Sequence, residues 1–340
     1  MADYKIIMSG NGGTIKLPES PEPETDFVSH TFTSCGKEGR TGPSLSQCQS
    51  AYYGTELLSG DYGFSVNQGI QSFVVPATGD YKIRAYGPRG VNNNNNVGKG
   101  AIMEGVFSLN SGERIQILVG QFSVYNGERE WQGGSGGTFV ALGESNSSAT
   151  PLVVAGGGGT NRSNEIFSSI MNASTGTSGK DGSGGEGGAN GYASSGGGHN
   201  SDQTGGGAAG FYQSANPKGD LRGGGGPFSG SESFGRGGVG GDFHPVDYSN
   251  FSLDGAFGGG GPGGWGGAGG GGGYSGGGNS ANSGYSGGGG SFISADAKSA
   301  ATSDGNFQIT GSEPTAAYTG PVQNIGSFNS TIGRVSIQKL

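Results

Sequence analysis

Glycine is distributed unevenly along this 340-residue chain, and that distribution constrains the fold more than any other feature. Of the 81 glycines, 52 fall between residues 151 and 290, whereas 24 precede that region and five follow it. A typical protein contains roughly 7 % glycine. Collagen is excluded because its three-residue glycine period and abundant proline are not found. The chain therefore divides into an ordinary flank, a glycine-rich insert and a short ordinary tail.

The insert admits two interpretations, a flexible Gly/Ser linker or an ordered backbone structure. Ordering its 52 glycines costs roughly 25–50 kcal/mol more than ordering alanines, so an ordered form needs dense backbone contacts. Extended helices of the polyproline II type, which rise about 3.1 Å per residue, can pack side by side and hydrogen-bond to their neighbours. We expect this ordered form because loops with aromatic residues, which a linker does not require, separate short glycine runs. Those aromatics are Phe211, Tyr212, Phe228, Phe234, Phe243, Phe251, Phe257 and Trp265.

Both flanks of the insert show the pattern of β-strands. Short alternating segments bounded by turn residues are typical of an all-β sandwich or jelly roll. The first flank opens with a predicted hairpin over residues 3–17 and a Pro/Glu-rich linker. We find no convincing amphipathic helix. The expected strands lie at 27–33, 72–75, 80–86, 101–108, 114–119, 138–142, 152–155, 291–294, 306–310 and 334–340.

The position of the last strands predicts how the insert is arranged. A sandwich whose closing strands follow the insert must bring residues 155 and 291 back to one body, so the insert should pack beside the sandwich. The predicted organisation is an N-terminal hairpin and linker at 1–26, the first part of the sandwich at 27–155, the insert at 156–290 and the closing strands at 291–340.

The residues outside the glycine runs resemble a known family in their order and spacing from about residue 27 to 340. They include Cys35-Gly36, Gln47-Cys48, Val75-Pro76-Ala77-Thr78, Ile117-Leu118-Val119-Gly120-Gln121, Glu130-Trp131 and Pro151-Leu152-Val153-Val154-Ala155. The chain is similar to the glycine-rich domain in the ectodomains of the anaplastic lymphoma kinase and leukocyte tyrosine kinase receptors. This resemblance implies a tumour-necrosis-factor-like (TNF-like) jelly-roll sandwich with an inserted bundle of polyglycine II helices. Tailed-phage adhesins with stacked polyglycine helices show a looser similarity.

The same resemblance implies that Cys35 and Cys48 form a disulfide, which would point to an extracellular or virion-exposed location. The alternative is two free thiols in a reducing cytosol. Residues 1–20 lack the apolar core of a classical signal peptide, so none is expected. Since no kinase domain follows, receptor signalling is not carried over from the family.

Several classes of function are not expected. A net charge of −8 argues against nucleic-acid binding, and no run of about 20 apolar residues could insert into a membrane. Only three histidines occur, at no metal-binding spacing, and no Gly-Lys-Ser/Thr sequence completes a phosphate loop. We expect no enzyme, no cofactor and no metal. Glycosylation sequons at Asn146, Asn161, Asn172, Asn250 and Asn329 fit either modification or chance.

Recognition is expected in the loops of the insert, because glycine offers no side chains. Aromatic residues beside Asp, His and Arg suit binding to a glycan or a protein. The alternative is that these aromatics fold back to cap the glycine bundle or to fill gaps against the sandwich. The predicted binding residues are Phe211, Tyr212, Arg222, Phe243, His244, Tyr248 and Phe251.

We expect a structural or adhesive protein of an extracellular assembly, most plausibly a phage fibre that binds a cell-surface glycan or protein. The alternatives are a receptor-type module that binds a protein ligand and a self-assembling filament subunit. Exposed strand residues near a terminus can pair with a neighbouring subunit, and the resemblance implies a homo-oligomer such as a trimer. The predicted assembly residues are Tyr4, Ile6, Ile7, Ile15 and Leu17.

Overall fold

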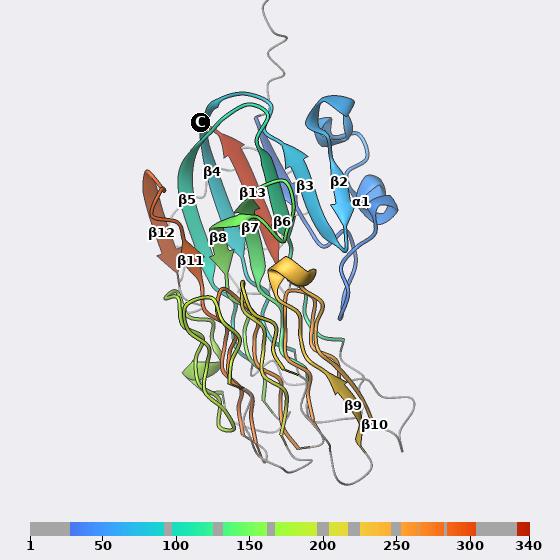
Figure 1. Cartoon of the computed structure of the whole chain (residues 1–340), viewed down its shortest axis with the longest axis vertical. Helices are drawn as coiled ribbons and strands as arrows, with labels where there is room; N and C mark the ends of the chain where they lie inside the picture. The colour runs from blue at the N-terminus through green and yellow to red at the C-terminus, as the bar shows by residue number, and fades with distance from the viewer. Residues whose placement is uncertain are drawn as a thin grey trace, which may run out of the picture.

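The computed structural model describes residues 28–91, 97–124, 132–161, 167–195, 204–216, 225–245, 253–264, 266–281, 284–303 and 332–340. Figure 1 shows the strands of the two larger sheets gathered at one end, with the glycine-rich segments extending away from them toward β9 and β10. The predicted hairpin, with Tyr4, Ile6, Ile7, Ile15 and Leu17, lies outside the described residues. The all-β fold class is confirmed, because the strands form antiparallel sheets.

The first sheet has five strands in the order β1-β13-β4-β5-β12. Adjacent strands in this sheet all pair antiparallel. Strand β4 pairs with β5 through eight residue pairs, from Gly79–Leu109 to Tyr86–Ile102. The strands are β1 (Ser29–Phe32), β4 (Gly79–Tyr86), β5 (Ile102–Leu109), β12 (Ser299–Ser303) and β13 (Arg334–Lys339).

The second sheet has six strands in the order β11-β8-β7-β6-β3-β2, also antiparallel throughout. One face of each sheet contributes to a shared apolar core that includes Phe32, Phe73, Ile83, Ile117 and Val335. The strands are β2 (Ser65–Asn67), β3 (Ile70–Val74), β6 (Arg114–Leu118), β7 (Thr138–Leu142), β8 (Thr150–Ala155) and β11 (Phe292–Ile293).

The alternation of β4 places its side chains as the sequence predicts. Tyr81, Ile83 and Ala85 are fully buried, whereas Lys82 and Arg84 remain half-exposed. Successive side chains of a strand point to opposite faces, so one pairing register determines which side chains face the core and which face outward.

The two flanks of the insert meet, as predicted. Strand β8 pairs with β11 through Val154–Phe292 and Val153–Ile293. The N–H of Gly156, directly after β8, donates to the Ser291 Oγ at 3.0 Å. The chain thus leaves and re-enters the six-stranded sheet at adjacent positions.

Some elements were not predicted. A short helix, α1 (Leu45–Ala51), is held by a capping box in which Gln47 N–H donates to Ser44 Oγ and Ser44 N–H donates to Gln47 Oε1. Strand β12 follows the insert but was not predicted, and the strand expected at 306–310 lies outside the described residues. The other unpredicted elements are β2, a ribbon of β9 (Gly225–Ser229) and β10 (Asp242–Pro245), and the 3₁₀ turns η1 (Glu56–Leu58), η2 (Gly60–Tyr62), η3 (Ser169–Met171) and η4 (Phe234–Arg236).

Within the insert, glycine backbones hydrogen-bond between segments that are far apart in sequence. Gly157 N–H donates to the Gly272 carbonyl at 2.8 Å, and Gly271 N–H donates to the Gly287 carbonyl at 3.0 Å. A Cβ added at Gly134 or Gly269 would collide with a carbonyl oxygen of the neighbouring segment. The insert is therefore packed backbone against backbone rather than a free linker, while the polyproline-II-type conformation of each segment stays a prediction.

Candidate functional site

A cluster of aromatic residues covers the part of the six-stranded sheet's outer face that adjoins the insert. Phe139 of β7 lies 5.5 Å, centroid to centroid, from Phe234 of η4, and Phe234 stacks on Phe211 at 4.9 Å. Tyr274 stacks on Phe292 of β11 at 4.5 Å. We call Phe139, Phe211, Phe234, Tyr274 and Phe292 the aromatic cluster. Leu118, Ile70 and Phe257 complete its apolar surroundings.

Tyr212 extends this cluster to the surface. Its ring makes edge contacts with Phe211 at 4.9 Å and with Tyr274 at 6.1 Å, yet 56 % of the residue stays exposed. Burial raises the pKa of Tyr274, and the nearby Tyr212 raises it further, so the Tyr274 phenol stays protonated at neutral pH.

A tight turn supports the ring of Tyr212 from below. Asn190 and Gly191 have φ values of 55° and 84°, and Tyr192 N–H donates to the Ala189 carbonyl at 3.0 Å. Two left-handed central residues are typical of a type I′ turn, for which Asn-Gly is a preferred pair. A Cβ at position 191 would collide with the Tyr212 ring. Glycine is thus required here both by its φ and by the aromatic ring above it.

Tyr192 follows this turn directly and is itself 53 % exposed. Its backbone is fixed next to Tyr212, because Tyr212 N–H donates to the Gly191 carbonyl and Gly276 N–H donates to the Tyr192 carbonyl. We call Tyr192 and Tyr212 the tyrosine pair. Two large exposed rings on a rigid backbone are a geometry suited to protein recognition.

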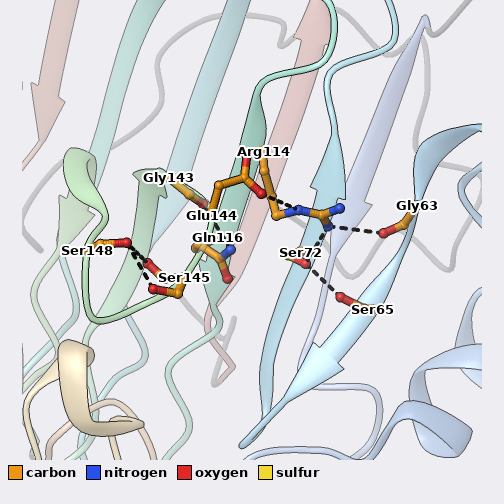
Figure 2. A network of polar contacts seen from close by, with 9 residues as sticks. All are labelled: Gly63, Ser65, Ser72, Arg114, Gln116, Gly143, Glu144, Ser145 and Ser148. Carbon is orange, nitrogen blue, oxygen red and sulfur yellow. Dashed lines mark hydrogen bonds and ion pairs between the residues drawn. The ribbon is translucent and has the colours of Figure 1, made fainter.

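A polar network occupies the other part of the same sheet face (Figure 2). The Arg114 guanidinium of β6 donates to the Gly63 carbonyl and to Ser72 Oγ, each at 3.2 Å, and lies 3.4 Å from Glu144. Ser72 in turn bonds to Ser65 of β2. Arg114 already has three partners. The network therefore stabilises the positions of strands and loops rather than presenting the guanidinium to a ligand.

Two predicted binding residues are buried, which corrects the prediction for them. Phe211 is 3 % exposed in the aromatic cluster, and Phe243 is 2 % exposed beside Leu253. Burying an aromatic ring stabilises the fold more than exposing it, so these rings pack inward as the capping alternative proposed. Tyr212 alone among the predicted binding residues is both described and exposed. Arg222, Tyr248, Phe251 and the side chain of His244 lie outside the described residues.

The implied disulfide between Cys35 and Cys48 is present, with Cα atoms 4.9 Å apart. It closes a loop that contacts the insert: Phe257 N–H donates to the Gly39 carbonyl at 2.7 Å. The loop therefore connects the sandwich to the glycine-rich body.

Sequence reasoning missed Tyr192, although the Asn190-Gly191 pair before it is a strong turn signal. It also did not decide whether the glycosylation sequons are modified. Asn161 and Asn172 are buried, and the Asn172 Oδ1 accepts the Lys99 N–H, so neither is accessible to a glycosyltransferase in the folded chain. The Asn146 amide donates to the carbonyls of Phe234 and Gly235.

The described parts of the chain also bear on metal and membrane sites. There, no group of three or more His, Cys, Asp or Glu residues is placed to hold a metal ion. Among the same residues, no helix has the length and apolar character needed to cross a bilayer.

Comparison with known proteins found similarity to a receptor. No protein-family model matches the chain. A stretch of 123 residues, 35 % of the chain, is 38 % identical to the leukocyte tyrosine kinase receptor of Mus musculus, and it covers only 13 % of that receptor. This supports a relationship to the ectodomains of that receptor class, and together with the disulfide it indicates an extracellular location. The predicted similarity to phage adhesins gains no support from it.

Proposed function

We propose that the chain is a non-enzymatic, receptor-type extracellular module that binds a protein ligand through the tyrosine pair. The similarity to a receptor ectodomain favours this alternative over a phage fibre. The finer fold assignment, a TNF-like jelly roll carrying a bundle of polyglycine II helices, belongs to the same proposal. The hydrogen bonds between distant glycine segments support it.

The observation that carries the proposal is the combination of exposure and rigidity at Tyr212. Its ring is more than half exposed, but it is fixed by Phe211, Tyr274 and the Asn190-Gly191 turn. Binding usually costs free energy because side chains at the interface lose rotamer freedom. A tyrosine that is already immobilised avoids much of this cost and can act as an anchor.

The surroundings of the tyrosine pair favour a protein ligand over a glycan. Between residues 181 and 195 the acidic side chains are Asp181, whose Oδ1 accepts the Gly187 N–H, and the exposed Glu186. Glycan recognition needs several convergent polar side chains around an aromatic ring. Along the chain, Tyr192 and Tyr212 adjoin two exposed polar side chains, Asn190 and Gln213, and otherwise mostly small residues, so the two phenol rings dominate a surface that suits a protein partner.

The experiment is a binding screen of the full chain against arrays of purified secreted proteins and of glycans. We expect a protein hit whose signal falls at least about tenfold in the Tyr192→Ala/Tyr212→Ala variant, since central tyrosines often contribute 2 kcal/mol or more. Tyr285→Ala is the matched control, because it removes a tyrosine that is 38 % exposed elsewhere in the insert. Hits on glycans alone, or protein hits equally strong in both variants, would contradict the proposal.

A further inference from the structure

The outer face of the five-stranded sheet carries a group of positive charges. Lys82 and Arg84 alternate on β4 with the buried Tyr81, Ile83 and Ala85, so both point away from the core. Register places Arg334 of β13 opposite Tyr86, and its guanidinium lies 3.9 Å from the centre of the Tyr86 ring. Tyr86 is buried beneath that guanidinium, and we call Lys82, Arg84 and Arg334 the cationic face.

The neighbours of the cationic face in the sheet are mostly apolar or uncharged. Tyr86 pairs with Ile102 and Lys82 pairs with Val106 on β5, and both apolar residues are half-exposed. Ser336 and Gln338 flank the charges on β13. The single carboxylate opposite the charges is Glu104, which is paired with Arg84. Arginine side chains beside half-exposed apolar residues are typical of a protein interface.

The segment of chain that connects β1 to β2 forms a lobe of opposite charge. It consists of α1, η1 and η2 and contains the exposed residues Tyr53, Glu56 and Asp61, which we call the acidic lobe. Tyr53 is 89 % exposed, the highest value of any large apolar or aromatic side chain that the structure describes. No lysine or arginine occurs between residues 41 and 81. Neither Glu56 nor Asp61 forms an ion pair with another described residue.

The two surfaces belong to different sheets of the sandwich. The acidic lobe contacts β2 and β3 of the six-stranded sheet, at the edge where Figure 1 shows α1, whereas the cationic face lies on β4 and β13 of the other sheet. The described parts of one chain contain no ion pair between them. Their charges therefore have no opportunity to neutralise each other within a single copy.

We propose that the acidic lobe of one copy docks on the cationic face of a second copy, with Tyr53 as the anchor beside the half-exposed Val106. The occupant is another copy of this chain because the chain itself supplies both the charge and the exposed aromatic residue that the cationic face would bind. Two different surfaces meet in such a contact, so it is heterologous and either closes into a ring or continues as a filament. Since the chain carries a net charge of −8, local attraction must overcome general repulsion, and the contact is weak and sensitive to salt.

The test is sedimentation velocity of the full chain over a range of concentrations at about 50, 150 and 500 mM NaCl. We expect concentration-dependent oligomers whose dissociation constant rises about tenfold or more over that salt range. Lys82→Glu/Arg334→Glu and Glu56→Lys/Asp61→Lys should each be monomeric alone. An equimolar mixture of the two variants should associate again, because each supplies the surface that the other lacks.

Controls separate the proposal from general charge effects and from unfolding. Arg236→Glu and Glu186→Lys change exposed charges outside both surfaces and should leave association intact. Thermal unfolding checks each variant, and Lys82→Glu alone tests the face without removing the Arg334–Tyr86 contact. A chain that is monomeric under all conditions, association that survives both double variants, or a mixture that stays monomeric would overturn the proposal.

Discussion

Arg40 and Gly240, which are 200 residues apart, are joined by two reciprocal hydrogen bonds. The Gly240 N–H donates to the Arg40 carbonyl, and the Arg40 Nε–H donates to the Gly240 carbonyl, each at 2.9 Å. Arg40 Nη2 also donates to Ser229 Oγ at 2.9 Å and lies 3.7 Å from Asp242. One arginine in the disulfide loop thus holds both strands of the β9–β10 ribbon against the sandwich.

Replacing Arg40 should loosen that ribbon. We expect Arg40→Ala to lower the free energy of unfolding by about 1–2 kcal/mol, because partly buried backbone and hydroxyl groups lose a charged partner. Arg236→Ala is the control, since Arg236 is exposed on η4 and should cost less than about 0.5 kcal/mol. Urea unfolding measures both values, and equal losses would contradict the assignment.

His30 predicts a specific loss of stability in acid. Its ring packs against Phe32 and Tyr52 at 4.7 and 4.8 Å, and its Nε2 is buried with no hydrogen-bond partner among the described residues. Burial lowers the pKa of His30 from 6.5 to about 4. The unfolded chain therefore takes up a proton first as the pH falls, so this contribution to stability is complete above pH 6.5 and disappears between about 6.5 and 4.

We expect the stability difference between His30→Phe and the wild type to grow in favour of the variant by about 2–3 kcal/mol between pH 7 and 4. Taking the difference removes the contributions of all other titrating groups that the two proteins share. Urea titrations at each pH provide the measurement. A difference that stays constant with pH would show that His30 titrates normally in the folded chain.

Gly191 should be intolerant of any side chain. We expect Gly191→Ala to destabilise the chain by about 1–2 kcal/mol, because φ is 84° and the new methyl group would collide with the Tyr212 ring. Gly176→Ala is a matched control in the same insert, where the added Cβ meets only Ser174 Oγ at 3.5 Å. Thermal unfolding and near-ultraviolet circular dichroism should separate the two variants, and a similar response of both would remove the proposed role of the turn.

The disulfide should contribute to stability through the loop that it closes. For two cysteines 13 residues apart, we expect the loss of the bond in Cys35→Ala/Cys48→Ala to cost about 3 kcal/mol. Reduction of the wild type should produce a comparable fall in its midpoint of urea unfolding. If reductant leaves that midpoint unchanged, the bond does not constrain the chain as described.

Much of the sandwich could be predicted from local sequence. The alternation at Tyr81, Ile83 and Ala85 determines which face of β4 is buried, and the apolar run that ends at Ala155 corresponds to β8. The helix α1 escaped prediction because only Cys48 of its seven residues is buried, so its sequence shows no apolar stripe. The capping box at Ser44 and Gln47 was the available signal.

The binding surface was harder to predict because exposure depends on tertiary packing. Phe211 and Tyr212 are adjacent and chemically similar, yet Phe211 stacks on Phe234 from a distant loop while Tyr212 remains exposed. Nothing in the local pattern distinguishes them. The partner that buries Phe211 is brought close only when the glycine segments pack together.

Hydrogen exchange at the glycine amides tests the central claim, that the insert is an ordered backbone bundle, most directly. Gly157, Gly271 and Gly272 donate their N–H groups to carbonyls of other segments and are buried. We expect these amides to exchange at least about a thousandfold more slowly than unstructured peptides, as amides in stable elements do. Exchange at the rate of an unstructured chain would show that the insert is a linker and would contradict the account.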